Sequence, residues 1–263
     1  MAQDRQGRHK GHCRIRRGIY RSVAALRADI RSFLEQHNAD PKPFKRTKSA
    51  DHILASIERF CLRNTPPGHV ALFALILGDA TRAWQIYEAQ VHPGGAWGPA
   101  LNVATDAPAF LWRAELAGQA RRVPLWREVR DYALKAFPKA GIAFVDVHRA
   151  LACVATDDRD GLAGIVAELE QRTASGRSPA GDVVQRLIAG LTAYGRGDWA
   201  AAIVGLEPAL AETVRIGGSR AQRDLVENTL LAAYLRDGRA ADARRLIATH
   251  ADRRPSVPVA GLA

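Results

Sequence analysis

A helix-to-helix turn recurs along most of this chain at an almost constant spacing. The predicted turns fall at Gly78, Gly118, Asp158, Gly197 and Gly238, which are 40, 40, 39 and 41 residues apart. A fixed period near 40 residues is typical of stacked helical hairpins, in which each hairpin buries its apolar face only against a neighbour. The spacing therefore predicts a helical repeat over residues 65–252.

The segments between these turns have the apolar periodicity of helices, and no window shows the alternation that strands require. The predicted helices are 69–77, 79–91, 105–118, 124–136, 142–155, 158–174, 182–195, 198–215, 219–236 and 240–251. In residues 198–215, one helix face carries Trp199, Ile203, Leu206, Leu210 and Val214. We expect an all-α fold, a right-handed solenoid of helical hairpins.

A small residue follows most of these turns at the same offset. Five residues beyond four of the turns stand Ala83, Ala163, Ala202 and Ala243. A small side chain at this offset lets the second helix of a hairpin cross the first closely. Val123 occupies the offset after Gly118 and is followed by Pro124, so we expect a longer connection in that hairpin.

Several stretches of the repeat region resemble known repeat families. Residues 197–203, Gly-Asp-Trp-Ala-Ala-Ala-Ile, look like the turn and second helix of a tetratricopeptide repeat. Residues 69–252 resemble the C-terminal half of the tetratricopeptide repeat protein 38 family through ALFALILGD, DAPAFLWRAELAG, FVDVHRALA, AYGRGDWAAAIVGLEPAL and RIGGSRAQRD. This resemblance implies stacked hairpins without an established reaction. Arg220 and Val145 depart from the histidine and asparagine usual in that family, and its N-terminal half has no counterpart here.

The first quarter of the chain has a different charge balance and a different resemblance. Residues 1–64 contain 15 Lys or Arg and 6 Asp or Glu, a net charge of +9 out of +11 for the chain. Two short helices are expected in this segment, after a disordered start. RIRRGIYRSVAALRADIRSFLEQHNADPKPF and TKSADHILASIERFC resemble the C-terminal tail of bacterial insertion-sequence transposases of the mariner-related DDE class. We therefore hypothesise a hybrid reading frame, made from an insertion-element end and a truncated repeat gene.

Two sets of residues are candidates for binding. The candidate phosphate contacts are Arg14, Arg16, Arg17, Arg21, Lys42, Lys45, Arg46 and Lys48, which would hold nucleic acid without reading its sequence. The alternative for these residues, which we favour, is a solvated charged tail left over from the transposase. The candidate ligand groove consists of Asp106, Arg113, Asp146, His148, Gln222, Arg223 and Asp224. The alternative for the groove residues, which we favour, is hydrogen bonding between helices that fixes their registry.

The chain offers no catalytic, cofactor or metal site that we can identify. The metal-binding carboxylates of the transposases precede the tail that this chain resembles. Cys13, Cys61 and Cys153 lie too far apart in sequence to suggest a metal site. No segment reads as a signal peptide or a membrane span, so we expect a cytoplasmic protein with a flexible tail at 253–263. The predicted function is a non-catalytic scaffold or binding module for a protein, peptide or small ligand; the alternative is a nonspecific DNA-binding remnant of a transposase.

Overall fold

The computed structural model describes residues 28, 31, 32 and 35, and then 67–96, 98–249 and 259–261. The chain divides into two compact units, Met1–Arg59 and Phe60–Ala263. In the first unit the four described residues are helical and exposed. They belong to the first helix expected in residues 1–64 and do not fall on its apolar stripe. The rest of that segment lies outside the described residues.

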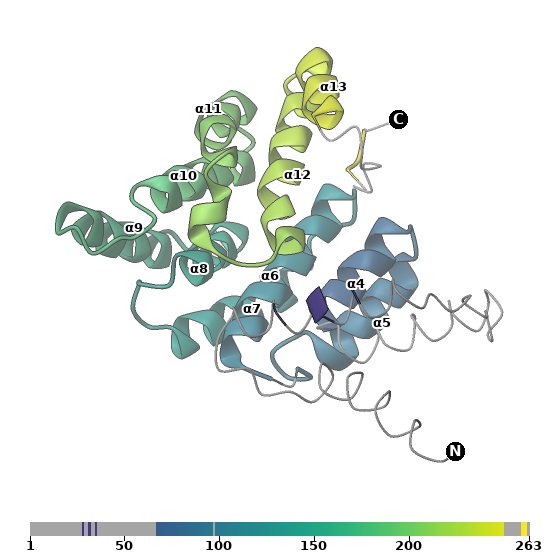
Figure 1. Ribbon diagram of the computed structural model, residues 1–263, viewed down its shortest axis with the longest axis horizontal. Helices are drawn as coiled ribbons and strands as arrows, with labels where there is room; N and C mark the ends of the chain where they lie inside the picture. The colour runs from purple at the N-terminus through teal and green to yellow at the C-terminus, as the bar shows by residue number, and fades with distance from the viewer. Residues whose placement is uncertain are drawn as a thin grey trace. The chain divides into compact units, whose positions relative to one another are not determined.

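The described part of the second unit is built from helices, with no strand. The helices are α4 (Pro67–Ile76), α5 (Ala80–Gln90), α6 (Ala100–Leu116), α7 (Val123–Ala136), α8 (Ala143–Ala155), α9 (Arg159–Ala174), α10 (Val183–Gly195), α11 (Trp199–Leu210), the 3₁₀-helix η1 (Thr213–Ile216), α12 (Arg220–Arg236) and α13 (Ala240–Ala248) (Figure 1). Each helix expected between residues 69 and 251 is present. The prediction of an all-α fold is confirmed for this part of the chain.

Two helix boundaries differ clearly from the prediction. Helix α6 begins at Ala100, five residues before the expected start at 105. The expected helix 198–215 is broken, because α11 ends at Leu210 and η1 follows it. Pro208 lacks the amide that would continue the hydrogen-bond ladder near this end. Val214 consequently leaves the apolar stripe and is 65% exposed.

The five hairpin turns share one backbone hydrogen-bond pattern. The residue with positive φ at each turn is Gly78, Gly118, Asp157, Gly197 or Gly238. Its amide and the next amide both donate to carbonyls in the last turn of the preceding helix. This pattern is the Schellman motif, which satisfies carbonyls left without partners at a helix end. The first helix of each hairpin therefore ends in the same way, and the same motif also ends α9 at Gly176.

The third turn lies one residue earlier than predicted. Asp157 has the left-handed conformation, with φ of 53°, and Asp158 instead caps α9 by accepting a hydrogen bond from the amide of Gly161. The offset of five residues therefore falls on Leu162, and Ala163 is exposed. The prediction that Ala163 packs against its partner helix was wrong. The alanines at the other predicted offsets, Ala83, Ala202 and Ala243, are buried as expected.

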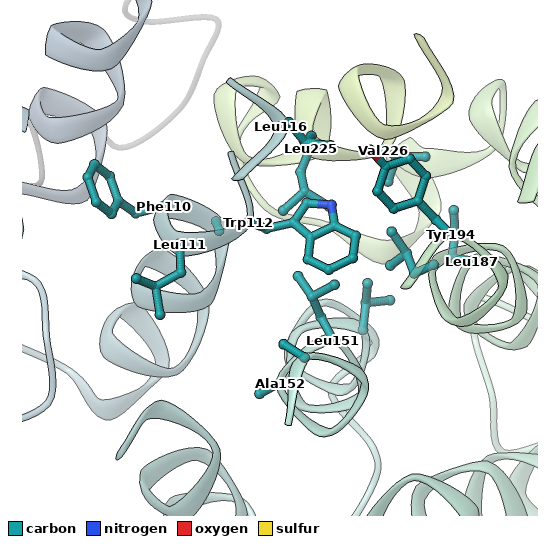
Figure 2. Close-up of a cluster of buried hydrophobic side chains, with 14 of the residues drawn as sticks. Phe110, Leu111, Trp112, Leu116, Leu151, Ala152, Leu187, Tyr194, Leu225 and Val226 are labelled. Atoms are coloured by element: carbon teal, nitrogen blue, oxygen red, sulfur yellow. The ribbon is translucent and has the colours of Figure 1, made fainter. Parts of the chain in front are cut away.

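The first helices of four hairpins surround a common core. Helices α6, α8, α10 and α12 each pack on the next, and α12 returns to contact α6 (Figure 1). Figure 2 shows the Trp112 indole of α6 among Leu151 of α8, Leu187 and Tyr194 of α10, and Leu225 of α12. Trp112 is 1% exposed. The space that these four helices enclose is therefore filled with side chains, at least around Trp112.

Residues 259–261, near the C-terminal end of the chain, pack against the end of α6. Val259 is buried, and the amide of Ala260 donates to the carbonyl of Leu116 at 2.8 Å. This bond satisfies a carbonyl in the last turn of α6, where the helix itself supplies no donor. Residues 259–261 thus differ from the flexible tail expected at 253–263.

Candidate functional site

Polar side chains of α6, α8 and α12 meet at a largely buried interface. We call it the polar seam and define it by Asp106, Arg113, His148, Gln222, Asp224 and Glu227. Gln222 Nε2 donates to Asp106 Oδ1 at 2.7 Å, and Gln222 Oε1 accepts the amide of Ser219 at 2.8 Å. One side chain therefore closes the capping box of α12 and joins α12 to α6. Burial raises the pKa of Asp106, against the lowering effects of Gln222 and His69.

The seam also contains a buried cation and a neutral histidine. Burial lowers the pKa of Arg113 to about 10, and the charges of Asp224 and Glu227 oppose this shift. Burial and, to a smaller extent, the nearby charge of Arg113 lower the pKa of His148 to about 4, although its contact with the carbonyl of Phe144 opposes this shift. The Nδ1 atom of His148 lies 2.8 Å from the carbonyl of Phe144. His148 is therefore neutral at pH 7 and bonded to its own helix.

The other two residues of the predicted groove, Asp146 and Arg223, lie outside the polar seam and bond to groups close to them in the sequence. Asp146 accepts hydrogen bonds from Arg149 at 3.1 Å and from the amide of Gly141 at 2.8 Å. Burial raises the pKa of Asp146, although both of these bonds lower it. Arg223 donates to the carbonyls of Gly217 and Gly218 in the loop before α12.

Burial decides between the two interpretations of the predicted groove. Asp106, Arg113, Asp146 and His148 are at most 7% exposed. The hollows that Asp106 and Arg113 line have volumes of about 20 and 10 Å³, which is room for little more than a water molecule. The geometry therefore favours structural roles for these side chains. Asp106 joins α6 to α12 through Gln222, and Arg113 interacts by charge with α12, as the alternative from the sequence expects. Asp146 and His148 instead bond within α8 or to the loop before it.

A separate cleft opens where α8 and α10 end. Its volume is about 470 Å³, within the range typical of small-molecule sites. We call it the turn cleft. Its lining includes the apolar side chains of Val123, Val154 and Leu162, the guanidinium groups of Arg121, Arg159 and Arg196, and Asp157.

The turn cleft lies at the two hairpin turns that depart from the repeat pattern. Val123 and Leu162 stand at the offset where the other three turns have a buried alanine. Neither of these larger side chains is buried as the alanines are: Val123 is 37% exposed, and Leu162 is partly buried. Asp157 is also the one non-glycine residue with positive φ in the described part of the chain. The irregular positions of the repeat therefore gather at one surface.

The three arginines of the cleft differ in how firmly they are held. Arg121 donates twice to Glu115, at 2.9 and 2.7 Å, and once to the carbonyl of Ala155 at 3.4 Å. Arg159 pairs with Asp157 at 3.2 Å, but both side chains are more than three quarters exposed. Arg196 is exposed and makes no ion pair within the described ranges. The guanidinium groups of Arg159 and Arg196 are thus accessible to a ligand.

Cys153 borders the same cleft but is not an activated thiol. It is fully buried, and burial raises its pKa to about 12. The thiolate is the nucleophilic form of cysteine, so this residue is unreactive near pH 7.

Other predicted sites lie outside the described residues or have no counterpart within them. All the candidate phosphate contacts, from Arg14 to Lys48, and also Cys13 and Cys61, fall where the structure describes no side chains. Among the described residues, no group of three or more His, Cys, Asp or Glu is arranged to hold a metal ion. None of the described helices combines the length and the apolarity needed to cross a membrane.

These features define an all-helical unit with a buried polar seam and an arginine-lined cleft. Comparison of the chain with protein-family models, curated proteins and solved structures found no match. The resemblances to the tetratricopeptide repeat protein 38 family and to transposase tails therefore remain predictions.

Sequence reasoning missed the arginines of the turn cleft. Val123 was one available signal, because it breaks the alanine pattern at Gly118. The matching break at Leu162 was hidden, since placing the third turn at Asp158 moved the offset onto Ala163. Correct placement of that turn needs the backbone conformation of Asp157.

Proposed function

We propose that the chain is a non-catalytic scaffold or binding module, built as a tightly closed series of tetratricopeptide-like helical hairpins. Five Schellman turns at nearly equal spacing support the repeat architecture. Contacts of α12 with α6 support the closure. A rigid stack with a ligand-sized cleft suits a protein that holds a protein, peptide or small ligand without changing it.

The observation that carries this proposal is the structural role of the contact between His69 and Ser219. His69 Nε2 lies 2.9 Å from Ser219 Oγ, a distance found in nucleophile–base pairs. However, Ser219 Oγ caps α12 by accepting the amide of Gln222, and no described carboxylate bonds to His69. The contact therefore joins α4 to the start of α12. Asp106 interacts with His69 by charge, but its carboxylate hydrogen-bonds to Gln222 and not to the histidine ring that a base would need oriented.

The test of this proposal is binding without turnover. Candidate ligands and substrates are incubated with the full chain, and any compound that raises the melting temperature is recovered and analysed. The expected result is recovery of unchanged compound. A purified preparation with hydrolase, nuclease or strand-transfer activity would contradict the proposal, provided that the activity is lost in Ser219→Ala or in another variant of the chain. That control separates the protein from a contaminant.

A second candidate function rests on the charge of the first quarter of the chain. The net charge of +9 in residues 1–64 supports nonspecific DNA binding through phosphate contacts. We expect the binding constant for duplex DNA to fall steeply between low and moderate salt. Changing Arg14, Arg16, Arg17 and Arg21 to Gln should reduce the salt slope by about one unit for each lost phosphate contact. An affinity that does not change with salt would exclude this function.

A further inference from the structure

We infer that the turn cleft binds a small organic anion with an apolar body, of the class of medium-chain carboxylates. This inference rests on the proposed function as a binding module and specifies the ligand. Its support is the combination of cleft size, apolar lining and accessible guanidinium groups at a surface where the repeat pattern is broken.

The apolar part of the lining suits a short hydrocarbon chain. Val123, Val154 and Leu162 provide the branched aliphatic surface. Gly195 at the end of α10 also lines the cleft, and a side chain there would collide with Val154. The glycine therefore lets α10 approach α8 without a side chain of its own at this point. A volume of about 470 Å³ accommodates a compound of this size.

The charges of the lining favour a negative head group. Three arginines and two aspartates line the cleft, and Arg121 among them is already paired with Glu115. Asp158 is occupied as the cap of α9, and Asp157 is engaged only by an exposed pair with Arg159, which contributes little. Arg159 and Arg196 therefore present planar guanidinium groups, which bind carboxylates through paired hydrogen bonds.

The C-terminal ends of α8 and α10, which lie at the cleft, do not cancel its preference for an anion. The last carbonyls of a helix carry partial negative charge that would favour a cation. At the end of α8, however, the amides of Asp157 and Asp158 bond to the carbonyls of Val154 and Cys153, and Arg121 donates to Ala155. The carbonyls of Ala193 and Tyr194 in α10 are satisfied by amides of its own turn. A cation would therefore find few free acceptors.

Binding of octanoate to the full chain tests the inference, with calorimetry for affinity and amide chemical shifts for location. A dissociation constant of about 1 mM or tighter is expected from typical ligand efficiencies. 1-Octanol lacks the charge and acetate lacks the apolar body, so each should bind at least about tenfold more weakly. Arg196→Gln should weaken octanoate binding about tenfold, which corresponds to about 1.4 kcal/mol. Arg244→Gln is the matched control, because Arg244 is exposed on α13 and has no ion pair in the described part.

Four outcomes would overturn the inference. The first three are no octanoate binding at millimolar concentration, equal binding of octanol and octanoate, and unchanged binding in a variant that combines Arg159→Gln with Arg196→Gln. Chemical-shift changes confined to residues away from the cleft would also overturn it. Each of these results leaves the scaffold proposal intact, because that proposal fails on catalytic turnover and not on the identity of this ligand.

Discussion

Two aspartate–arginine pairs of nearly equal length occupy opposite environments in this protein. Asp146 and Arg149 lie 3.1 Å apart with side chains 1% and 4% exposed, whereas Asp157 and Arg159 lie 3.2 Å apart with side chains 79% and 78% exposed. In the buried pair, each charged side chain is shielded from water and bonds to the other instead. Removal of either one therefore leaves the other as a buried charge without a partner. The pair in the turn cleft remains solvated, and its members are free to exchange partners. The N–O distance alone therefore does not determine how much an ion pair contributes to stability.

The largest expected effect comes from breaking the buried pair. Asp146→Ala leaves Arg149 buried without its partner and should lower the free energy of unfolding by about 3–5 kcal/mol. Arg159→Ala removes the exposed pair and should change the free energy of unfolding by less than about 0.5 kcal/mol. Urea unfolding followed by circular dichroism measures both. Similar losses for the two variants would show that burial is not what distinguishes the pairs.

Protonation of His148 should lower the free energy of unfolding by a smaller amount. Its pKa is about 4 in the folded chain against an ordinary value of 6.5, so the folded state favours the neutral form. This contribution to stability is complete above pH 6.5 and is lost as the pH falls towards 4. Between pH 7 and pH 5 it should fall by about 2 kcal/mol.

Comparison with His148→Gln isolates this contribution. The raised pKa values of Asp106 and Asp146 act in the opposite sense, because they favour the folded state as the pH falls. These aspartates are present in both proteins, so their effect cancels in the difference. Unfolding free energies measured at pH 7 and pH 5 should decline more in the unaltered chain. An equal decline in the variant would exclude His148 as the titrating group.

The irregular turn should gain stability when it is made regular. Asp157→Gly removes the cost of a left-handed conformation at a residue with a side chain and should stabilise the fold by about 0.5–1 kcal/mol. Gly197→Asp makes the reverse change at a regular turn and should destabilise by a similar amount. Thermal unfolding compares the two. A loss of stability in Asp157→Gly would show that the exposed pair with Arg159 contributes more than we expect.

The smallest stability effect is expected at Arg196. Its side chain is exposed and makes no ion pair within the described residues, so Arg196→Gln should alter the unfolding free energy by no more than about 0.5 kcal/mol. The same variant should weaken octanoate binding. A large loss of stability would mean that Arg196 supports the fold, and the binding result would then need a different variant.

Most helices were predictable because their signals are local. A Schellman turn joins residues fewer than six positions apart, and the capping aspartates Asp79, Asp158 and Asp198 bond to amides three residues away. The third turn was misplaced by one residue, since two adjacent aspartates make both positions plausible by composition. The break after Leu210 was missed because the apolar spacing continues to Val214 although the backbone does not remain α-helical.

The sequence by itself determined most of the helices, the near-constant spacing of their turns and most polar residues of the seam, but not the arginines of the turn cleft. Tertiary structure alone decided that the predicted groove residues are largely buried, that α12 returns to α6 and that the irregular turns leave a cleft. The closure depends on pairs such as Asp106 with Gln222 and Trp112 with Thr229, which are 116 and 117 residues apart. Periodicity within a helix shows which face is apolar, but the partner of that face depends on how all the hairpins pack together.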